Sequence, residues 1–412
     1  MSDAASGQGT GDLPPLDRAE RVTPWTPTTS AQQLDDLRAR LRRWRPPAFA
    51  DEASWTEGTD PGYLAHVVDA WLAHVDAARQ PDAHSHPWFE ADLALPRTSE
   101  SASGATARVR FIHVRGRRQP GAPEPVPLLL CHGWPDSAWR YQEVIDLLAD
   151  PGSHGGDPRD AFDVVVPDMP GFGHSPAPAG DALDSVAVAH LFAGLMHTLG
   201  YRRYAVAGGD IGSSVARFMA LDHPRDLLAV HRMDAGIPVF TGDPATLTPE
   251  EREWLGTAAA WGATEGAYAA LHRTKPATIA AALSDSPAGM AAWVVEKLEA
   301  WSDSRQGRFG GIPLDAVLTL LTTTWLTNSI GPSMRMYRAN ARIPAAEHAR
   351  RVEVPSGFSL FPADLLSPPR TWLDRIAAVT SVRTPERGGH FAPREVPDVY
   401  AAELRDFFRP FR

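Results

Sequence analysis

The sequence has little of several features that would assign it to a class at once. It has one cysteine, Cys131, in 412 residues, which excludes a disulfide framework and a zinc ribbon. No stretch approaches about 18 consecutive apolar residues, so we expect no membrane-spanning helix. The net charge is −10, and no basic run longer than the one around Arg42 and Arg43 stands out. Nucleic acid is therefore not an expected partner.

What the sequence does contain is typical of a globular protein. Hydrophobic residues make up 43% and charged residues 22%, enough apolar material for a large core. Residues 1–24 are poor in apolar side chains, and we expect a disordered tail there. Residues 1–13 lack the basic and apolar pattern of a secretory signal, so the expected location is cytoplasmic.

The next segment, residues 25–106, is interpreted as an N-terminal helical arm. Ser30 and Gln33 form a capping-box pattern, and three leucines then recur at helical spacing. This first helix is expected to end before Pro46. A second helix is predicted at about 62–78, with its apolar side chains along one face.

From residue 107 onward, strand patterns alternate with helical ones. The buried strands read as short, continuous apolar runs, because both faces of a parallel sheet are covered. This alternation predicts an α/β fold, with a mostly parallel central sheet and helices on both faces. The expected strands lie near 109–113, 127–131, 162–166, 203–207, 227–232, 352–354 and 377–382, and the last helix lies near 396–408.

The alternation fails between residues 236 and 345. That segment reads as helical and is rich in alanine and tryptophan. We interpret it as an inserted helical cap. The α/β core would then consist of residues 107–235 and 346–412.

The strongest chemical signal stands at a strand-to-helix junction. The spacing Gly208-x-Asp210-x-Gly212 is that of a nucleophile elbow, with aspartate in place of serine. Small flanking residues let the strand and the helix approach closely, and the start of a helix favours a negative side chain. An aspartate here could equally be an ordinary helix cap, so the other motifs must decide.

A second motif, His132-Gly133-Trp134-Pro135, directly follows an apolar strand. In proteins with such an elbow, this loop supplies one N–H of an oxyanion hole. Pro135 has no N–H, so Trp134 would be the donor. The residue after the nucleophile, Ile211, would supply the second N–H. His132 is interpreted as a structural residue of the loop.

A third motif places a histidine late in the chain. His390 follows two glycines and precedes the last helix, which makes it the candidate general base. A histidine base needs an orienting carboxylate, and we assign Asp364, which follows the strand near 352–354. Asp234 follows an earlier strand and remains a competitor. The order Asp210, Asp364, His390 is that of nucleophile, acid and base in proteins with this elbow.

Together these motifs resemble the epoxide hydrolases of the α/β-hydrolase superfamily, specifically the microsomal type with an N-terminal helical arm. The resemblance covers about residues 25–409. The matching stretches, in chain order, are Leu34-Asp35-Asp36-Leu37, Phe111-Ile112-His113, His132-Gly133-Trp134-Pro135, Gly208-Gly209-Asp210-Ile211-Gly212-Ser213, Thr274-Lys275-Pro276, Asp285-Ser286-Pro287-Ala288-Gly289, Phe361-Pro362-Ala363-Asp364-Leu365-Leu366 and Gly388-Gly389-His390-Phe391.

The resemblance implies hydrolysis of an epoxide to a vicinal diol. Asp210 would open the epoxide and form an ester, and His390 with Asp364 would activate the water that hydrolyses it. Two tyrosines would hydrogen-bond the epoxide oxygen, and Tyr268 and Tyr337 stand at the matching positions. Tyrosine, with a pKa of about 10, can donate at neutral pH. No cofactor and no metal are implied. The expected partners are an apolar epoxide and water, and a homodimer is left open.

Three alternatives stay open. A haloalkane dehalogenase also uses an aspartate nucleophile, but it relies on a tryptophan directly after it, so Ile211 and the tyrosine pair count against this function. The other two are a biosynthetic enzyme, in which a substrate hydroxyl closes a ring, and a ligand-binding protein without turnover. The complete set of site residues weighs against the last.

Overall fold

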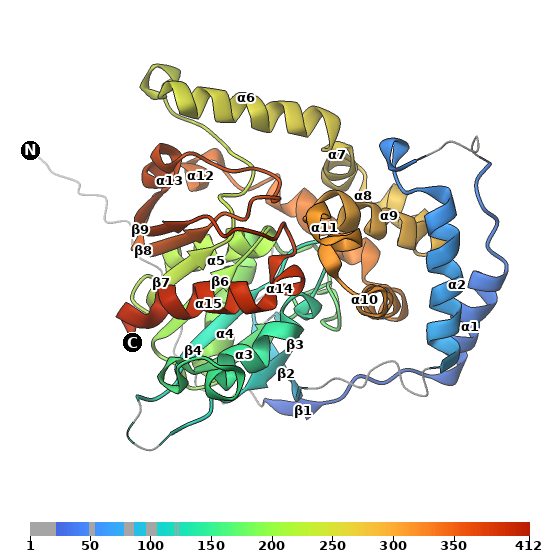
Figure 1. The fold of residues 1–412 in the computed structure, drawn as a ribbon, viewed down its shortest axis with the longest axis horizontal. Coiled ribbons are helices and arrows are strands. Elements are labelled where there is room, and N and C mark those ends of the chain that lie inside the picture. Colours follow the sequence, from blue (N-terminus) through green and yellow to red (C-terminus); the bar gives the residue numbers. More distant parts are fainter. Residues whose placement is uncertain (1–21, 49–53, 78–85, 96–104, 120, 122) are drawn as a thin grey trace, which may run out of the picture.

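The computed structural model describes residues 22–48, 54–77, 86–95, 105–119, 121 and 123–412. Within these residues, a nine-stranded sheet runs in the order β1-β2-β3-β5-β4-β6-β7-β8-β9 (Figure 1). The strands from β5 to β9 in that order are parallel, and β1, β2 and β3 add an antiparallel edge. The predicted α/β fold with a mostly parallel sheet is confirmed. The strands are β1 (Thr23–Trp25), β2 (Trp88–Ala94), β3 (Thr106–Val114), β4 (Val126–Cys131), β5 (Phe162–Pro167), β6 (Tyr204–Gly208), β7 (Leu227–Arg232), β8 (Val352–Ser359) and β9 (Ala377–Arg383).

Helices cover both faces of the sheet, as the continuous apolar strands predict. In β4, Leu128 and Leu130 pack with helices α3 (Ile145–Ala149) and α15 (Pro397–Phe408). Leu129 and Cys131 point the other way and pack with α4 (Ser185–Thr198) and α5 (Ile211–Asp222). All four side chains are fully buried, because alternate residues of a central strand face opposite layers.

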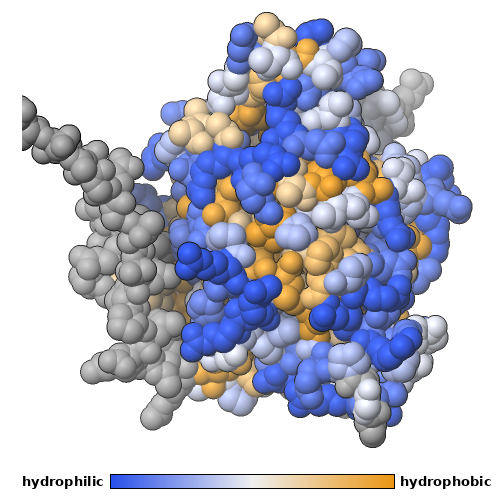
Figure 2. All heavy atoms as spheres, turned by 90° about the vertical axis from the view of Figure 1, so that its left-hand side faces the viewer, coloured by the Kyte–Doolittle hydropathy of each residue, from blue (hydrophilic) through white to orange (hydrophobic). Residues whose placement is uncertain are grey.

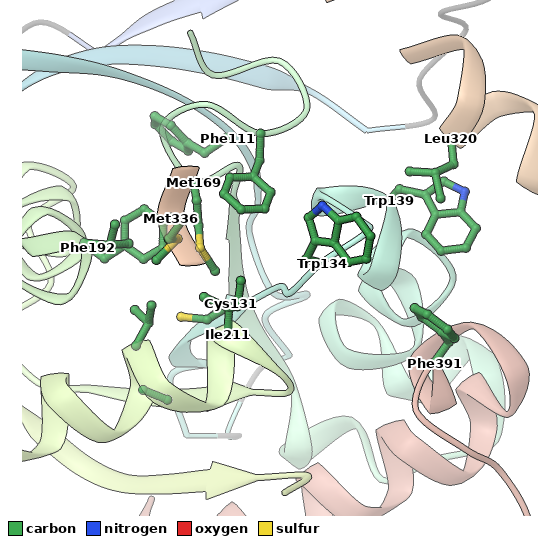
Figure 3. Close-up of a cluster of buried hydrophobic side chains, with 14 of the residues drawn as sticks. Phe111, Cys131, Trp134, Trp139, Met169, Phe192, Ile211, Leu320, Met336 and Phe391 are labelled. Carbon is green, nitrogen blue, oxygen red and sulfur yellow. The ribbon is translucent and has the colours of Figure 1, made fainter. Parts of the chain in front are cut away.

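A helical insertion separates β7 from β8, and it contacts the core near the predicted site. The Trp139 indole donates to the carbonyl of Ala316 at 2.8 Å. Figure 3 shows the same ring beside Leu320, within a buried apolar cluster that also includes Trp134 and Ile211. The helices of the insertion are α6 (Pro249–Thr264), α7 (Ala267–Thr274), α8 (Pro276–Leu283), α9 (Pro287–Ala300), α10 (Leu314–Leu326), α11 (Ile330–Asn340) and α12 (Ala345–Ala349).

The two helices of the N-terminal arm lie against this insertion and away from the sheet (Figure 1). Helix α1 (Ala31–Arg42) begins at the predicted capping box, and α2 is Pro61–Ala77. The Trp71 indole donates to Thr322 Oγ1 at 2.8 Å. Thr59 Oγ1 donates to the carbonyl of Ala292 at 2.6 Å. The arm thus holds α9 and α10 in place from outside.

The predicted boundary of the disordered tail, residue 24, lies inside the first strand. Residues 1–21 lie outside the described residues, but β1 begins at residue 23 and pairs with β2. Trp25 lies opposite Trp88 in this pairing, and their rings meet edge to face at 5.9 Å. The contact between the partly buried Trp25 and the buried Trp88 gives the chain a reason to order here, which low apolar content alone did not reveal.

The arm predicted over residues 25–106 is not wholly helical. Strand β2 lies within it and runs antiparallel to β3 along its whole length. Ala91 and Leu93 are buried, whereas Asp92 between them is exposed. That alternation is typical of a strand with one covered face, and it was the missed signal.

Candidate active site

Asp210 lies at the sharp bend between β6 and α5. Its φ of 58° and ψ of −129° place it in the region that few residues other than glycine adopt. A Cβ atom on Gly212 would lie 1.9 Å from the carbonyl oxygen of Cys131, so only glycine allows this approach. Asp210 makes no side-chain cap hydrogen bond to α5. The geometry is therefore that of a nucleophile elbow and differs from an ordinary helix cap.

Both carboxylate oxygens of Asp210 have defined neighbours. The Trp134 N–H donates to Oδ1 at 2.8 Å. Oδ2 lies 3.5 Å from His390 Nε2. On the other side of the ring, His390 Nδ1 lies 2.7 Å from Asp364 Oδ1. The structure thus brings the four residues into one chain of contacts. In the described part of the chain, the Ile211 N–H donates to no protein atom.

Asp234, the competitor for the orienting acid, has a different task. Its Oδ2 accepts the N–H of Asp210 at 2.7 Å, and its Oδ1 accepts the N–H of Gly236 at 2.7 Å. Burial and the nearby charge of Asp364 raise the pKa of Asp234 to about 6. Because both of its oxygens hold backbone groups, Asp234 supports the bend at the elbow, whereas Asp364 pairs with Nδ1 of the His390 ring.

The environment of His390 favours its charged form in the absence of substrate. Burial opposes the charge, but the carboxylates of Asp364 and Asp210 outweigh it and raise the pKa of His390 to about 10. The backbone N–H of His390 donates to the carbonyl of Trp301, at the end of α9, at 2.9 Å. The helical insertion and the loop of the candidate base are therefore joined directly.

A buried ion pair, missed in the sequence, joins the two loops of the site. Arg140 Nε donates to Asp136 Oδ2 at 2.6 Å, and Asp136 Oδ1 accepts the N–H of Gly133 at 2.9 Å. Arg140 Nη1 then donates to the carbonyl of His390 at 2.7 Å. The pair links the loop of Trp134 to the loop of the base. Its spacing of four residues, just after the second motif, is the signal that could have revealed it.

Two further buried groups have structural roles in these loops. His132 Nε2 accepts the N–H of Met169 at 2.9 Å, as expected of a structural histidine. Asp168 accepts the N–H groups of Ala138 and His174, each at 2.7 Å. Burial raises the pKa of Asp168. The carboxylate therefore serves as an acceptor that ties the loop after β4 to the loop after β5.

The two candidate tyrosines come from different helices of the insertion. Tyr268 lies in the first turn of α7 and Tyr337 lies in α11, with ring centroids 5.9 Å apart. The Tyr268 ring stacks on Trp134 at 5.3 Å, with 12° between the planes. Burial raises the pKa of both phenols above the usual range, so both stay protonated at neutral pH.

The candidate nucleophile, base, orienting acid and both tyrosines open into one cavity of about 330 Å³, which Ile211 and Asp234 also line. This volume lies in the range of small-molecule sites, whose walls are mostly apolar. Ile237 and Val239, which contribute to the walls, are 56% and 45% exposed and form part of the rim. Figure 2 shows apolar side chains gathered in the middle of one face of the molecule, framed by hydrophilic ones. Further apolar wall residues are Trp261, Leu365, Leu366 and Trp372.

No group of three or more His, Cys, Asp or Glu side chains among the described residues is arranged to hold a metal ion. None of the helices in the described ranges combines the length and apolar character needed to cross a membrane.

Comparisons with known proteins identify the family. One family model, described as the epoxide hydrolase N terminus, matches residues 22–141, and another, described as the alpha/beta hydrolase fold, matches residues 126–279. A putative epoxide hydrolase of Stigmatella aurantiaca (strain DW4/3-1) is 32% identical over 396 residues, which cover 95% of this chain and 86% of that protein. The chain belongs to the epoxide hydrolases.

Other epoxide hydrolases match over similar spans. Epoxide hydrolase 1 of Sus scrofa is 30% identical, with 97% of this chain and 91% of that protein covered. The crystal structure of juvenile hormone epoxide hydrolase from Bombyx mori has a TM-score of 0.80 at 27% identity and covers 95% of both chains. The structure of Aspergillus niger epoxide hydrolase has a TM-score of 0.76 at 27% identity and covers 96% of this chain and 97% of that chain. The predicted α/β-hydrolase fold and enzyme class are confirmed.

Proposed function

We propose that this epoxide hydrolase forms a covalent ester on Asp210 and hydrolyses it with water activated by His390. The placement of the two Asp210 oxygens carries this proposal. Oδ2 lies 3.5 Å from His390 Nε2, and Oδ1 already accepts the Trp134 N–H at 2.8 Å. If Oδ2 attacks the epoxide carbon, Oδ1 becomes the ester carbonyl oxygen. It then sits in the hydrogen bond that would stabilise the oxyanion of the second step.

In the first step, Tyr268 and Tyr337 act as proton donors to the epoxide oxygen. The bond from Asp210 Oδ2 to carbon forms as the ring C–O bond breaks, and the departing oxygen takes a proton from a phenol. Burial keeps both phenols protonated, which supports this role. The helical insertion that carries them acts as a cap over Asp210. Trp134 contributes its ring as well, because Tyr268 stacks on it.

In the second step, His390 changes from an acid to a base. Formation of the ester removes the charge of Asp210, one of the groups that raise the pKa of His390. The ring then gives its proton to the tyrosinate and so restores the phenol. Neutral His390 takes a proton from water, and the hydroxide attacks the ester carbon. Trp134 and Ile211 donate their N–H groups to the oxyanion. Collapse expels the alkoxide, which takes the proton of the new carboxyl group and leaves as the diol. Asp210 is again a carboxylate and keeps one oxygen atom from water, and His390 again carries its proton.

Incubation with styrene oxide tests this function. We expect the corresponding diol, and we expect no halide release from a panel of chloroalkanes and bromoalkanes. The lack of a tryptophan after Asp210 and the presence of the tyrosine pair favour the epoxide. Halide release without diol formation would instead make the protein a dehalogenase.

Removal of the phenol hydroxyls should slow the first step. Tyr268→Phe and Tyr337→Phe should each lower the rate of ester formation by roughly 10²-fold, because general acid assistance is worth about that much. Rapid quenching of a single turnover measures this rate separately from ester hydrolysis. Tyr63→Phe is the matched control, since Tyr63 packs against Phe309 and neither residue lines the cavity. If both site variants form ester at the normal rate, the tyrosines are not the donors.

A further inference from the structure

The far end of the cavity is lined by positively charged side chains. Asp210, Ser214 and Arg217 follow one another at helical spacing along one side of α5, and all three line the cavity. Arg217 therefore lies roughly 10 Å beyond the nucleophile, at 1.5 Å of rise per residue. Arg232, the last residue of β7, lines the same cavity. Neither arginine has a role in the ester mechanism.

Arg232 is buried with part of its guanidinium unpaired. It is 2% exposed, and its Nε donates to Ser213 Oγ at 2.9 Å. Its Nη1 is buried and has no hydrogen-bond partner among the described residues. Burial lowers the pKa of Arg232 to about 10, which leaves it charged at neutral pH. A buried cation with an unpaired N–H group is costly to keep, so the donor is expected to serve a ligand.

Arg217 adds a second guanidinium that is only partly used. It is 8% exposed. Its Nη2 donates to the carbonyls of Glu347, His348 and Arg350 at 3.2, 3.1 and 2.6 Å. Within the described residues, Nε and Nη1 make no hydrogen bond. These three contacts fix the position of the side chain and leave donors for a ligand.

The other polar groups at this end of the cavity also suit a ligand that accepts hydrogen bonds. Asn340 lines the cavity, and its Oδ1 already accepts the N–H of Ser185 at 2.7 Å, so only its N–H groups remain. Asp234 is the carboxylate whose charge acts on Arg232, but both of its oxygens are taken by backbone N–H groups. This end of the cavity therefore offers donors and positive charge without a carboxylate free to pair with them.

We propose that the enzyme takes an epoxide that also carries a carboxylate, held by Arg232 and by Arg217, which lies about 10 Å along α5 from Asp210. The inference rests on the proposed function, because it places the epoxide at Asp210. The apolar walls between the two ends fit a hydrocarbon spacer. A carboxylate accepts hydrogen bonds from two guanidinium groups, which a neutral ester cannot do with equal strength.

A series of terminal epoxides tests this, each with a straight hydrocarbon spacer of different length that ends in a carboxylate or in its methyl ester. In the wild type, kcat/KM for the acid should exceed that for the ester by roughly 10- to 100-fold, as charged hydrogen bonds allow. The preference should peak where the spacer spans about 10 Å. Arg232→Met should remove it, and Arg342→Met, on the exposed surface, should retain it. Equal turnover of acid and ester at every length would overturn the proposal.

A binding measurement separates this inference from the proposed function. Asp210→Asn protein is titrated in a calorimeter with an alkenoic acid of matching length, which lacks the epoxide, and with its methyl ester. We expect the acid to bind more tightly, and only when Arg232 is present. If the wild type turns over no epoxide but this binding pattern holds in the Asp210→Asn protein, the ester mechanism is wrong and the carboxylate site stands. Equal binding of acid and ester, or an unchanged acid preference in Arg232→Met, would refute the site.

Discussion

Replacing Asp210 with asparagine should abolish diol formation, with a loss in kcat/KM of roughly 10⁴-fold or more. Asparagine has nearly the same shape, so it fits the tight space beside Gly133, where a Cβ atom would lie 2.4 Å from that of Asp210. The carboxamide is a poor nucleophile and carries no charge. Initial rates with styrene oxide measure the loss. An unchanged unfolding temperature verifies the fold. Turnover that survives in this variant would mean that another residue attacks the epoxide.

The same variant gives a second, independent result through His390. The carboxylate of Asp210 helps to raise the pKa of this ring to about 10, so its removal should let the ring lose its proton at a lower pH. Nitrogen NMR of the histidine side chains measures the change. Asp181→Asn, at an exposed position outside the cavity lining, is the control and should leave the titration unchanged. An identical His390 titration in Asp210→Asn would contradict the acid-to-base change proposed for this ring.

Replacing His390 with glutamine should stop the second step and leave the first intact. Ring opening needs Asp210 and the tyrosines, whereas ester hydrolysis needs the base. The protein should therefore accumulate as an ester, and kcat should fall by roughly 10³-fold. Intact-protein mass spectrometry should show an increase equal to one epoxide per chain, located on Asp210 by peptide mapping.

The matched control for this variant is His66→Gln, on the exposed side of α2. It should turn over normally and show no adduct. If His390→Gln keeps normal turnover, or if its adduct lies on a residue other than Asp210, the assignment of base and nucleophile is wrong.

The elements that could be predicted from the sequence are those set by local patterns. The strands of the parallel core appear as apolar runs, and the elbow appears as a glycine spacing, because a close strand–helix approach excludes any Cβ atom at Gly212. Strand β2 was missed because its exposed face carries charge. The capping box at Ser30 set the start of α1 correctly, since the motif is complete within one helical turn.

The parts of the site that could not be predicted depend on contacts between distant segments. Asp234 follows β7 and Asp364 follows β8, and these two strands are parallel neighbours. Both aspartates therefore lie at the same edge of the sheet, where the carboxyl ends of the strands meet. Only the hydrogen bonds show that one holds the elbow and the other faces the histidine ring. The hydrogen bond from Arg140 to the His390 carbonyl joins residues 250 positions apart, and no local sequence pattern predicts it. The tyrosines were found by family resemblance alone.

A single turnover in water enriched in ¹⁸O, with the enzyme in excess over the epoxide, tests the covalent mechanism most directly. The ester route predicts that the peptide containing Asp210 gains one heavy oxygen atom and that the diol gains none, since both diol oxygens come from the epoxide and the original carboxylate. A labelled diol with an unlabelled Asp210 peptide would show that water attacks the epoxide directly.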